Sequence, residues 1–286
     1  MSIVELYGRG DPVISFEFFP PKTDAGFRSL FSSIEDLKQL APGFVSVTMG
    51  AGGSTRAKTV DLVIRIQQEI GITAMAHLPC TGFGRAQISE ILDHLETGGV
   101  RNVLSLRGDP PQDTEDFRPP KDGFAYANEL TEFIAARGGF CIGGACYPEV
   151  HPEAPSAEVD LENLVRKVRA GAEFLVSQLF FDNQKFFAFV DRAHAAGIDV
   201  PIVAGIMPIT SVKSIRRMIS LGGGSIPAEL DRELALVDED DAGTLEIGVQ
   251  WATEQCRELL DRGVPGIHFY TLNRSPATRR IHEALF

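Results

Sequence analysis

Eight short apolar runs recur along the chain, and each is followed by a stretch with a helical pattern. The runs are rich in Val, Ile and Phe, as β-strands are, and they cover residues 13–19, 44–50, 73–79, 100–108, 140–148, 173–181, 200–207 and 266–272. Strands that alternate with helices at this spacing are typical of βαβ units and a parallel sheet. Eight such units predict an α/β fold of the (β/α)8 TIM-barrel class.

The stretches between the strands carry apolar residues at steps of three and four, which is the helical period. Residues 27–37 form one such stripe, and residues 244–262 form another. The interval 208–265 is longer than the others and holds patterns for three helices, so we expect an extra helical insertion between the seventh and eighth strands. No break in composition divides the chain, and residues 1–286 are predicted to form a single catalytic domain.

Polar residues stand near the ends of successive predicted strands. Their spacings are 31, 29, 30, 40 and 31 residues, which is the length of a βα unit; the residues are Glu17, Thr48, His77, Arg107, Tyr147 and Gln178. The carboxyl ends of barrel strands carry the loops that build the active site. The sequence therefore predicts that these side chains meet at one rim of the barrel.

Glu17 is a single carboxylate in the apolar run "VISFEFFPPK", between Phe16 and Phe18. Aromatic neighbours would disfavour the charged form, and a protonated carboxylic acid can act as a general acid. The alternative is a structural carboxylate paired with an Arg or Lys across the barrel.

Two further segments carry candidate binding residues. "RGDPP" places Arg107, Gly108 and Asp109 at a strand end, where Arg can anchor phosphate and Gly lets the backbone approach a ligand. The alternative is an Arg–Asp pair that closes a turn. The Pro-rich segment 108–124 is interpreted as a rim loop or lid.

The segment after Tyr147 predicts a helix with a polar stripe. Asp160, Asn163 and Lys167 fall at i, i+3 and i+7, so they share one helix face. Such a stripe could hold phosphate and ribose, or it could simply be a solvated face.

Composition excludes several classes of function. The net charge is −12, which argues against a nucleic-acid binder, because such proteins cluster Lys and Arg. The four cysteines form no C-x-x-C pair, no secretory signal region precedes the first strand, and no apolar run reaches 18 residues. We expect a cytoplasmic protein with free thiols. Neither a metal-ligand motif nor a Rossmann G-x-G-x-x-G is present, and no Lys lies at a strand end to form a Schiff base.

Seven motifs, taken in order from about residue 13 to residue 276, resemble bacterial methylenetetrahydrofolate reductases. They are "SFEFFPPK", "SVTMGAGGST", "AHLPC", "LRGDPP", "YPEVHPEA", "DLENLVRKVRAGAEFLVSQLFFD" and "HFYTLNR". The resemblance implies an FAD-containing barrel that uses NADH or NADPH to reduce 5,10-methylenetetrahydrofolate to 5-methyltetrahydrofolate in a ping-pong cycle. It also explains the missing Rossmann signature, since this family holds FAD on barrel rim loops.

The resemblance implies roles for particular residues. Glu17 takes the position of the general acid, and Asp109 that of a charge beside the flavin. Cofactor contacts would fall on Thr48, His77, Arg107, Gly108, Asp109, Tyr126, Ala127, Ala145, Tyr147, His151, Asp160, Asn163 and Lys167. Substrate contacts would fall on Glu17, Gln178, Met218, Tyr270 and Arg274.

Met218 stands where some members of the family have a Phe that stacks on the substrate and on the nicotinamide nucleotide. Relatives form dimers or tetramers, so a homo-oligomer is expected, with no partner beyond the small-molecule substrates. Two rival hypotheses stay open at this stage. One is an FAD barrel of the proline dehydrogenase type, and the other is a barrel lyase or aldolase without a redox cofactor.

Overall fold

Eight parallel strands close into a barrel in the order of the sequence, with β1 paired to both β2 and β8. The structure, a computed structural model, describes residues 1–49, 53–109, 120–237 and 240–286. The strands are β1 (Val13–Phe18), β2 (Phe44–Val47), β3 (Ala74–Pro79), β4 (Asn102–Leu106), β5 (Cys141–Cys146), β6 (Phe174–Ser177), β7 (Ile202–Ile206) and β8 (Gly266–Tyr270). All eight predicted strands and the predicted barrel class are thus confirmed.

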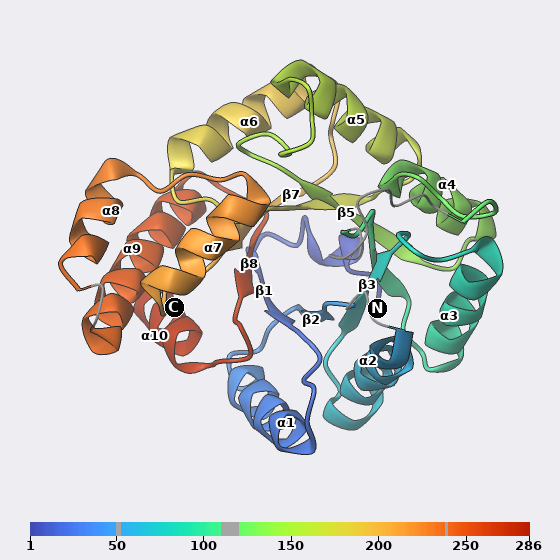
Figure 1. Ribbon diagram of the computed structural model, residues 1–286, viewed down its shortest axis with the longest axis horizontal. Helices are drawn as coiled ribbons and strands as arrows, with labels where there is room; N and C mark the ends of the chain where they lie inside the picture. The colour runs from blue at the N-terminus through green and yellow to red at the C-terminus, as the bar shows by residue number, and fades with distance from the viewer. Residues whose placement is uncertain (50–52, 110–119, 238–239) are drawn as a thin grey trace.

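A ring of helices surrounds the strands (Figure 1). Within the described residues these are α1 (Asp24–Lys38), α2 (Gly53–Arg65) continued by the π-helical η2 (Ile66–Ile70), α3 (Arg85–Thr97), α4 (Ala127–Arg137), α5 (Ala157–Arg169), α6 (Asn183–Ala195), α7 (Val212–Gly222), α8 (Ala228–Ala235), α9 (Asp241–Asp261) and α10 (Pro276–Leu285). Three of them, α7, α8 and α9, lie between β7 and β8 in the chain. They gather with α10 on one side of the barrel, at the left of Figure 1.

Strand alternation divides the core into two parts. Outward-facing residues such as Phe16, Phe18 and Val45 pack against the helices in the larger cluster. Inward-facing residues such as Phe44 and Phe174 fill the barrel in a smaller cluster. The short helix η1 (Val4–Leu6) adds apolar side chains to that smaller cluster, at the end where the strands begin. Glu17 and His77 lie toward the opposite end, near the carboxyl ends of β1 and β3.

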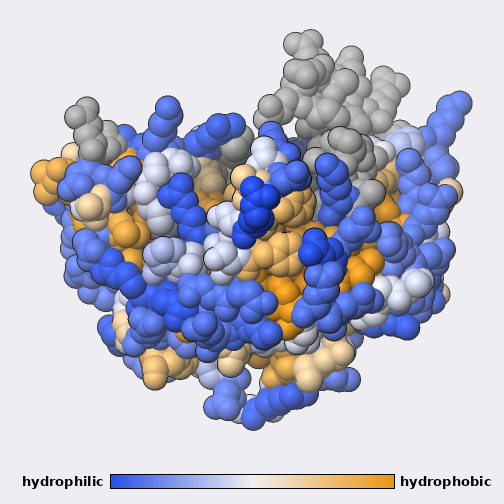
Figure 2. All heavy atoms as spheres, turned by 90° about the horizontal axis from the view of Figure 1, so that it is seen from below, coloured by the Kyte–Doolittle hydropathy of each residue, from blue (hydrophilic) through white to orange (hydrophobic). Residues whose placement is uncertain are grey.

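On the side seen in Figure 2, the helix ring presents mostly hydrophilic residues. Figure 2 shows polar side chains over much of the face seen from the side of α1 and α2, with apolar side chains gathered between them. No helix in the described part of the chain is long and apolar enough to cross a membrane.

Two segments predicted from the sequence lie partly outside the described residues. The strand expected over 44–50 ends at Val47, and residues 50–52 lie outside the described part. Most of the proposed lid over 108–124 also lies outside it, since residues 110–119 are not described.

Candidate active site

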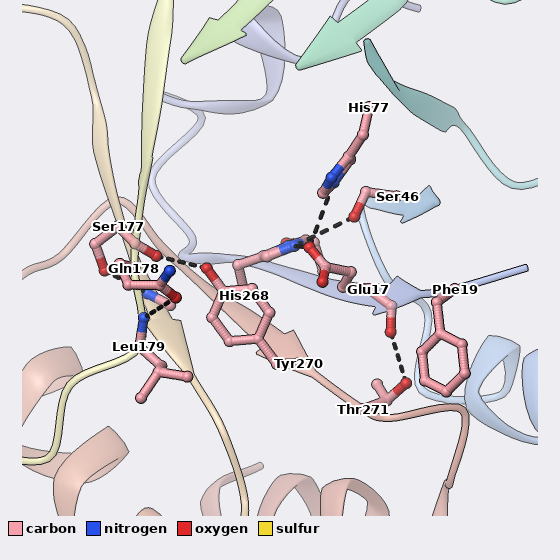
Figure 3. A network of polar contacts seen from close by, with 12 residues as sticks. Glu17, Phe19, Ser46, His77, Ser177, Gln178, Leu179, His268, Tyr270 and Thr271 are labelled. Carbon is pink, nitrogen blue, oxygen red and sulfur yellow. Dashed lines mark hydrogen bonds and ion pairs between the residues drawn. The ribbon is translucent and has the colours of Figure 1, made fainter. Parts of the chain in front are cut away.

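Glu17 lies near the carboxyl end of β1 and points into the barrel, as Figure 3 shows. Its Oε2 atom is 3.3 Å from Nε2 of His77 and 3.5 Å from Nε2 of His268. The side chain is 18% exposed, so it reaches solvent at the mouth of the barrel. Both ion-pair partners found for this carboxylate among the described residues are histidines rather than an Arg or a Lys.

The surroundings expected for Glu17 are corrected by the structure. Phe16 and Phe18 flank it in the sequence, but strand residues alternate between faces, so both rings pack into the outer helix layer. The inward neighbours of Glu17 are imidazoles and hydroxyls instead. The prediction that Phe16 and Phe18 surround the carboxylate was wrong, and the aromatic residue paired with Glu17 on the neighbouring strand β8 is Tyr270.

His268 is a site residue that the sequence reasoning missed. It is fully buried on β8, with Nδ1 2.7 Å from the hydroxyl of Ser15 and Nε2 3.3 Å from that of Ser46. Its ring stacks on Phe44 with centroids 5.8 Å apart. The register pairs Ser15 with His268, so strand alternation in "GIHFY" could have placed this imidazole inside the barrel once the pairing of β1 with β8 was assumed.

The Nε2 atom of His77, on β3, lies near Glu17 at the mouth of the barrel. Although Nε2 lies 3.3 Å from Glu17, it makes no hydrogen bond to any described residue. Burial lowers the pKa of His77, and Glu17 opposes that shift in part. A buried nitrogen without a hydrogen-bond partner is costly unless a ligand or water pairs with it.

Tyr270 and Gln178 lie on the other side of Glu17 (Figure 3). The Tyr270 hydroxyl donates to the backbone oxygen of Ser177 at 2.6 Å, and burial raises the pKa of the phenol. The Gln178 amide oxygen accepts the backbone N–H of Leu179 at 2.9 Å, which leaves the amide nitrogen for another acceptor. The rim thus brings a carboxylate, two imidazoles, a phenol and an amide together.

A cavity of about 530 Å³ lies beside this cluster, above β4 and β5 and along α5. Nine of the sequence-predicted cofactor positions line it: Arg107, Tyr126, Ala127, Ala145, Tyr147, His151, Asp160, Asn163 and Lys167. The other four, Thr48, His77, Gly108 and Asp109, do not line this cavity and lie at or just beyond the ends of β2, β3 and β4.

The polar stripe of α5 lines this cavity, and its middle residue, Asn163, is also exposed to solvent. Asp160 accepts the backbone N–H of His151 at 3.0 Å, and Lys167 donates to the backbone oxygen of Ala145 at 2.6 Å. Burial lowers the pKa of Lys167, while Cys146 and Asp160 oppose that shift. The stripe therefore holds the β5–α5 loop in place and leaves an amine at the cavity wall.

Arg107 forms a two-pronged ion pair with Glu153, with both N–O distances at 2.5 Å. This contact replaces the Arg107–Asp109 pair considered as the alternative from the sequence. Glu153 keeps the pKa of Arg107 raised, and the Asp109 charge adds to that effect. Asp109 itself is exposed directly after Gly108, a residue whose φ of +80° favours glycine.

The cavity wall also contains cations that sequence reasoning did not select. Arg166 and Arg192 line it together with Arg107 and Lys167. Arg166 lies one residue before Lys167, so the stripe identified on α5 could have pointed to it. Arg192 comes from α6, and no sequence pattern connects it to this site.

The remaining predicted substrate residues lie toward β7 and β8. Met218 on α7 packs partly buried against a cluster that includes Leu179 and Ile215. Tyr270 and Arg274 line a second cavity of about 340 Å³, which is also bounded by the first residues of α9 and α10.

The residues present suit a flavin dinucleotide. Cationic side chains around a 530 Å³ cavity suit phosphates, and the rings of Tyr126 and Tyr147 suit a flat ligand. Nε2 of His77 makes no hydrogen bond to the described residues, so it can bond a ligand. A metal is less well supported, since the described residues contain no group of three or more His, Cys, Asp or Glu side chains placed to hold one.

Comparisons with known proteins place nearly the whole chain in one family. The sequence profile of the family described as "Methylenetetrahydrofolate reductase" matches residues 3–286. The chain is 36% identical over 286 residues to the Escherichia coli K12 protein named 5,10-methylenetetrahydrofolate reductase, covering 99% of this chain and 93% of that protein.

Eukaryotic relatives are longer. Methylenetetrahydrofolate reductase 2 of Saccharomyces cerevisiae is 38% identical, and Methylenetetrahydrofolate reductase (NADH) 1 of Arabidopsis thaliana is 40% identical. The matches cover 96% and 93% of this chain but 47% of each relative, so the chain spans about half the length of these curated relatives.

Among solved structures, an uncharacterized Clostridium thermocellum protein that binds two copies of 5-methyl-5,6,7,8-tetrahydrofolic acid superimposes with a TM-score of 0.64. The two sequences are 14% identical, and the match covers 100% of this chain and 98% of that one. At this identity the likeness supports the barrel fold alone.

Proposed function

Because the chain belongs to the methylenetetrahydrofolate reductase family, we propose that it reduces 5,10-methylenetetrahydrofolate to 5-methyltetrahydrofolate with electrons from NADH or NADPH. The observation that carries this proposal is the position of Glu17, a carboxylate within 3.5 Å of two imidazoles at the mouth of the barrel. The cationic cavity beside it supports a bound FAD.

The residues proposed to hold FAD form two sets. Arg107 and Lys167 would face its phosphates, with Asp160 and Asn163 near the ribose, and Tyr126, Ala127, Ala145, Tyr147 and His151 would complete the wall. His77, Thr48, Gly108 and Asp109 would approach it from the strand ends. A flavin held by these residues would supply hydride transfer from the nicotinamide to the folate, in a ping-pong cycle.

Glu17 is proposed as the general acid. It would donate a proton to the folate nitrogen that leaves as the five-membered ring opens, because a cationic iminium is a better hydride acceptor than the closed ring. The Nε2 atoms of His77 and His268 lie close enough to return a proton to the carboxylate between turnovers. Asp109 would favour the cationic iminium through its negative charge.

Substrate orientation falls to residues on β6, α7 and β8. The hydrogen bond from Leu179 uses only the amide oxygen of Gln178, so its amide nitrogen can donate to the pterin. Met218 would pack against a flat ring, since a thioether side chain adapts to aromatic surfaces. Tyr270 and Arg274 would contact the folate tail, and Arg274 is an exposed cation suited to its carboxylates.

The test is anaerobic turnover of the purified protein with NADH and 5,10-methylenetetrahydrofolate, with the product identified by chromatography against 5-methyltetrahydrofolate. The expected result is stoichiometric oxidation of NADH and formation of that product. Proline as the only substrate should yield no reduction of the flavin. Absence of 5-methyltetrahydrofolate from a protein that retains FAD would refute the proposed function.

A further inference from the structure

We propose that Asn273 is a positioning residue that fixes the backbone of the acid-bearing strand end and connects it to Arg274. The inference rests on the proposed function, because it assigns Asn273 a role in the folate half-reaction. Asn273 belongs to the turn between β8 and α10, which carries Tyr270 before it and Arg274 after it.

The Asn273 side chain pairs with the backbone of Phe19 in both directions. Its Oδ1 accepts the Phe19 N–H at 2.9 Å, and its Nδ2 donates to the Phe19 oxygen at 2.8 Å. A peptide group in a neighbouring strand would offer the same donor and acceptor. β1 ends at Phe18 and β8 at Tyr270, so this amide continues the β1–β8 pairing past the ends of both strands.

Thr271 holds the other side of the same strand end. Its hydroxyl donates to the backbone oxygen of Glu17 at 2.6 Å, a contact visible in Figure 3. The same hydroxyl accepts the Asn273 N–H at 3.2 Å. The backbone on both sides of Phe18, and directly behind the Glu17 carboxylate, is therefore held by one short turn.

The turn adopts a conformation that its residues rarely prefer. Leu272 and Asn273 have φ values of +51° and +59°, in the left-handed region. Asn adopts this region more readily than Leu, so contacts from outside the turn must stabilise Leu272 in it. One such contact comes from α1, where the Ser33 hydroxyl donates to the Asn273 oxygen at 3.0 Å.

The turn between β8 and α10 connects Arg274, the proposed contact of the folate tail, to the strand end that carries Glu17. A folate carboxylate bound by Arg274 pulls on a turn whose preceding residues are bonded to Glu17 and Phe19. Binding energy from a remote part of the substrate would then align the acid with the reacting nitrogen. Because displacement of a reacting group by about 1 Å can lower a rate about 100-fold, loosening this turn should slow proton donation.

The test uses Asn273→Gly, which keeps left-handed freedom but removes both amide contacts, and the matched pair Thr271→Val and Thr271→Ser. In rapid mixing of the FAD-loaded enzyme, reduction by NADH should keep its wild-type rate. The folate half-reaction should slow by about 10- to 100-fold in Asn273→Gly and Thr271→Val, and Thr271→Ser should restore it.

A second readout does not depend on activity. Pro20 and Pro21 carry no amide hydrogen, so a peptide over 17–21 reports exchange at the Phe19 amide after its first residues back-exchange. That exchange should accelerate in Asn273→Gly, while the peptide over β3 keeps its protection.

Two results would overturn the inference. One is an unchanged rate of the folate half-reaction in Asn273→Gly and Thr271→Val. The other is an equal loss of rate in both half-reactions, because a merely structural role would slow both. Failure of the proposed function is distinguishable from both. It would appear in the wild-type enzyme, as flavin that NADH reduces and 5,10-methylenetetrahydrofolate fails to reoxidise.

Discussion

Replacement of Glu17 by Gln should separate the two half-reactions of the proposed cycle. The amide has nearly the shape of the carboxylate, and neither imidazole nitrogen approaches closer than 3.3 Å, so no short hydrogen bond is lost. We expect the free energy of unfolding to change by less than about 1 kcal/mol, since the side chain is partly exposed. The proton donor, however, is removed completely.

General acid catalysis contributes about 100- to 10,000-fold to rate. At about 1.36 kcal/mol for each factor of ten, the barrier of the folate half-reaction should rise by about 2.7–5.4 kcal/mol. Flavin content and reduction by NADH should be unchanged, because hydride transfer from the nicotinamide requires no proton from Glu17.

The assay is anaerobic rapid mixing that follows the flavin absorbance, first with NADH and then with 5,10-methylenetetrahydrofolate. Glu35→Gln, which removes an exposed carboxylate from α1, serves as the matched control and should behave as wild type. A Glu17→Gln enzyme that reoxidises with folate within threefold of the wild-type rate would refute the assignment of the acid.

Three further predictions follow from other side chains. Asp109→Asn should retain FAD but slow the folate half-reaction in the same rapid-mixing assay, and unchanged kinetics would remove its electrostatic role. Because burial lowers the pKa of His77, the unfolded chain binds an extra proton below about pH 6.5, so stability should fall as pH falls through this range. In urea titrations at several pH values, the free energy of unfolding should fall less steeply with decreasing pH in His77→Gln than in the wild type. The same pH dependence in both proteins would contradict this prediction. Glu149, on the loop before α5, accepts hydrogen bonds from the Ser225 N–H at 3.1 Å, from the Ser225 hydroxyl at 2.6 Å and from the Lys185 ammonium. Glu149→Gln should therefore lose about 1–3 kcal/mol of unfolding free energy in urea, and a loss below 0.5 kcal/mol would argue against this clamp.

Much of the fold could be predicted from the sequence because its signals are local. Buried parallel strands read as short apolar runs, and helices read as stripes of three- and four-residue steps. Some strands were predicted to end too late, as at 44–50, where β2 ends at Val47. Thr48 is β-branched and Met49 is apolar, so the strand pattern continues in the sequence beyond the last residue of the strand. Residue spacing also located Glu17, His77 and Arg107 near the correct rim.

The rest of the site depends on contacts between distant segments. Neighbours in the sequence suggested an aromatic setting for Glu17, but the register of β1 with β8 decides its true neighbours, Tyr270 and His268. The partner of Arg107 is 46 residues away in Glu153, and no local pattern indicates it. The expected homo-oligomer and the cytoplasmic location stay predictions.

The central claim is that this barrel carries electrons from a reduced nicotinamide to a folate through a bound flavin. The most direct measurement is the visible spectrum of the purified protein, recorded anaerobically before NADH, after NADH, and after addition of 5,10-methylenetetrahydrofolate. We predict a flavin absorption band that NADH bleaches and the folate restores, with no other electron acceptor present. A colourless protein that still forms 5-methyltetrahydrofolate, or a bleached flavin that the folate leaves reduced, would contradict the account.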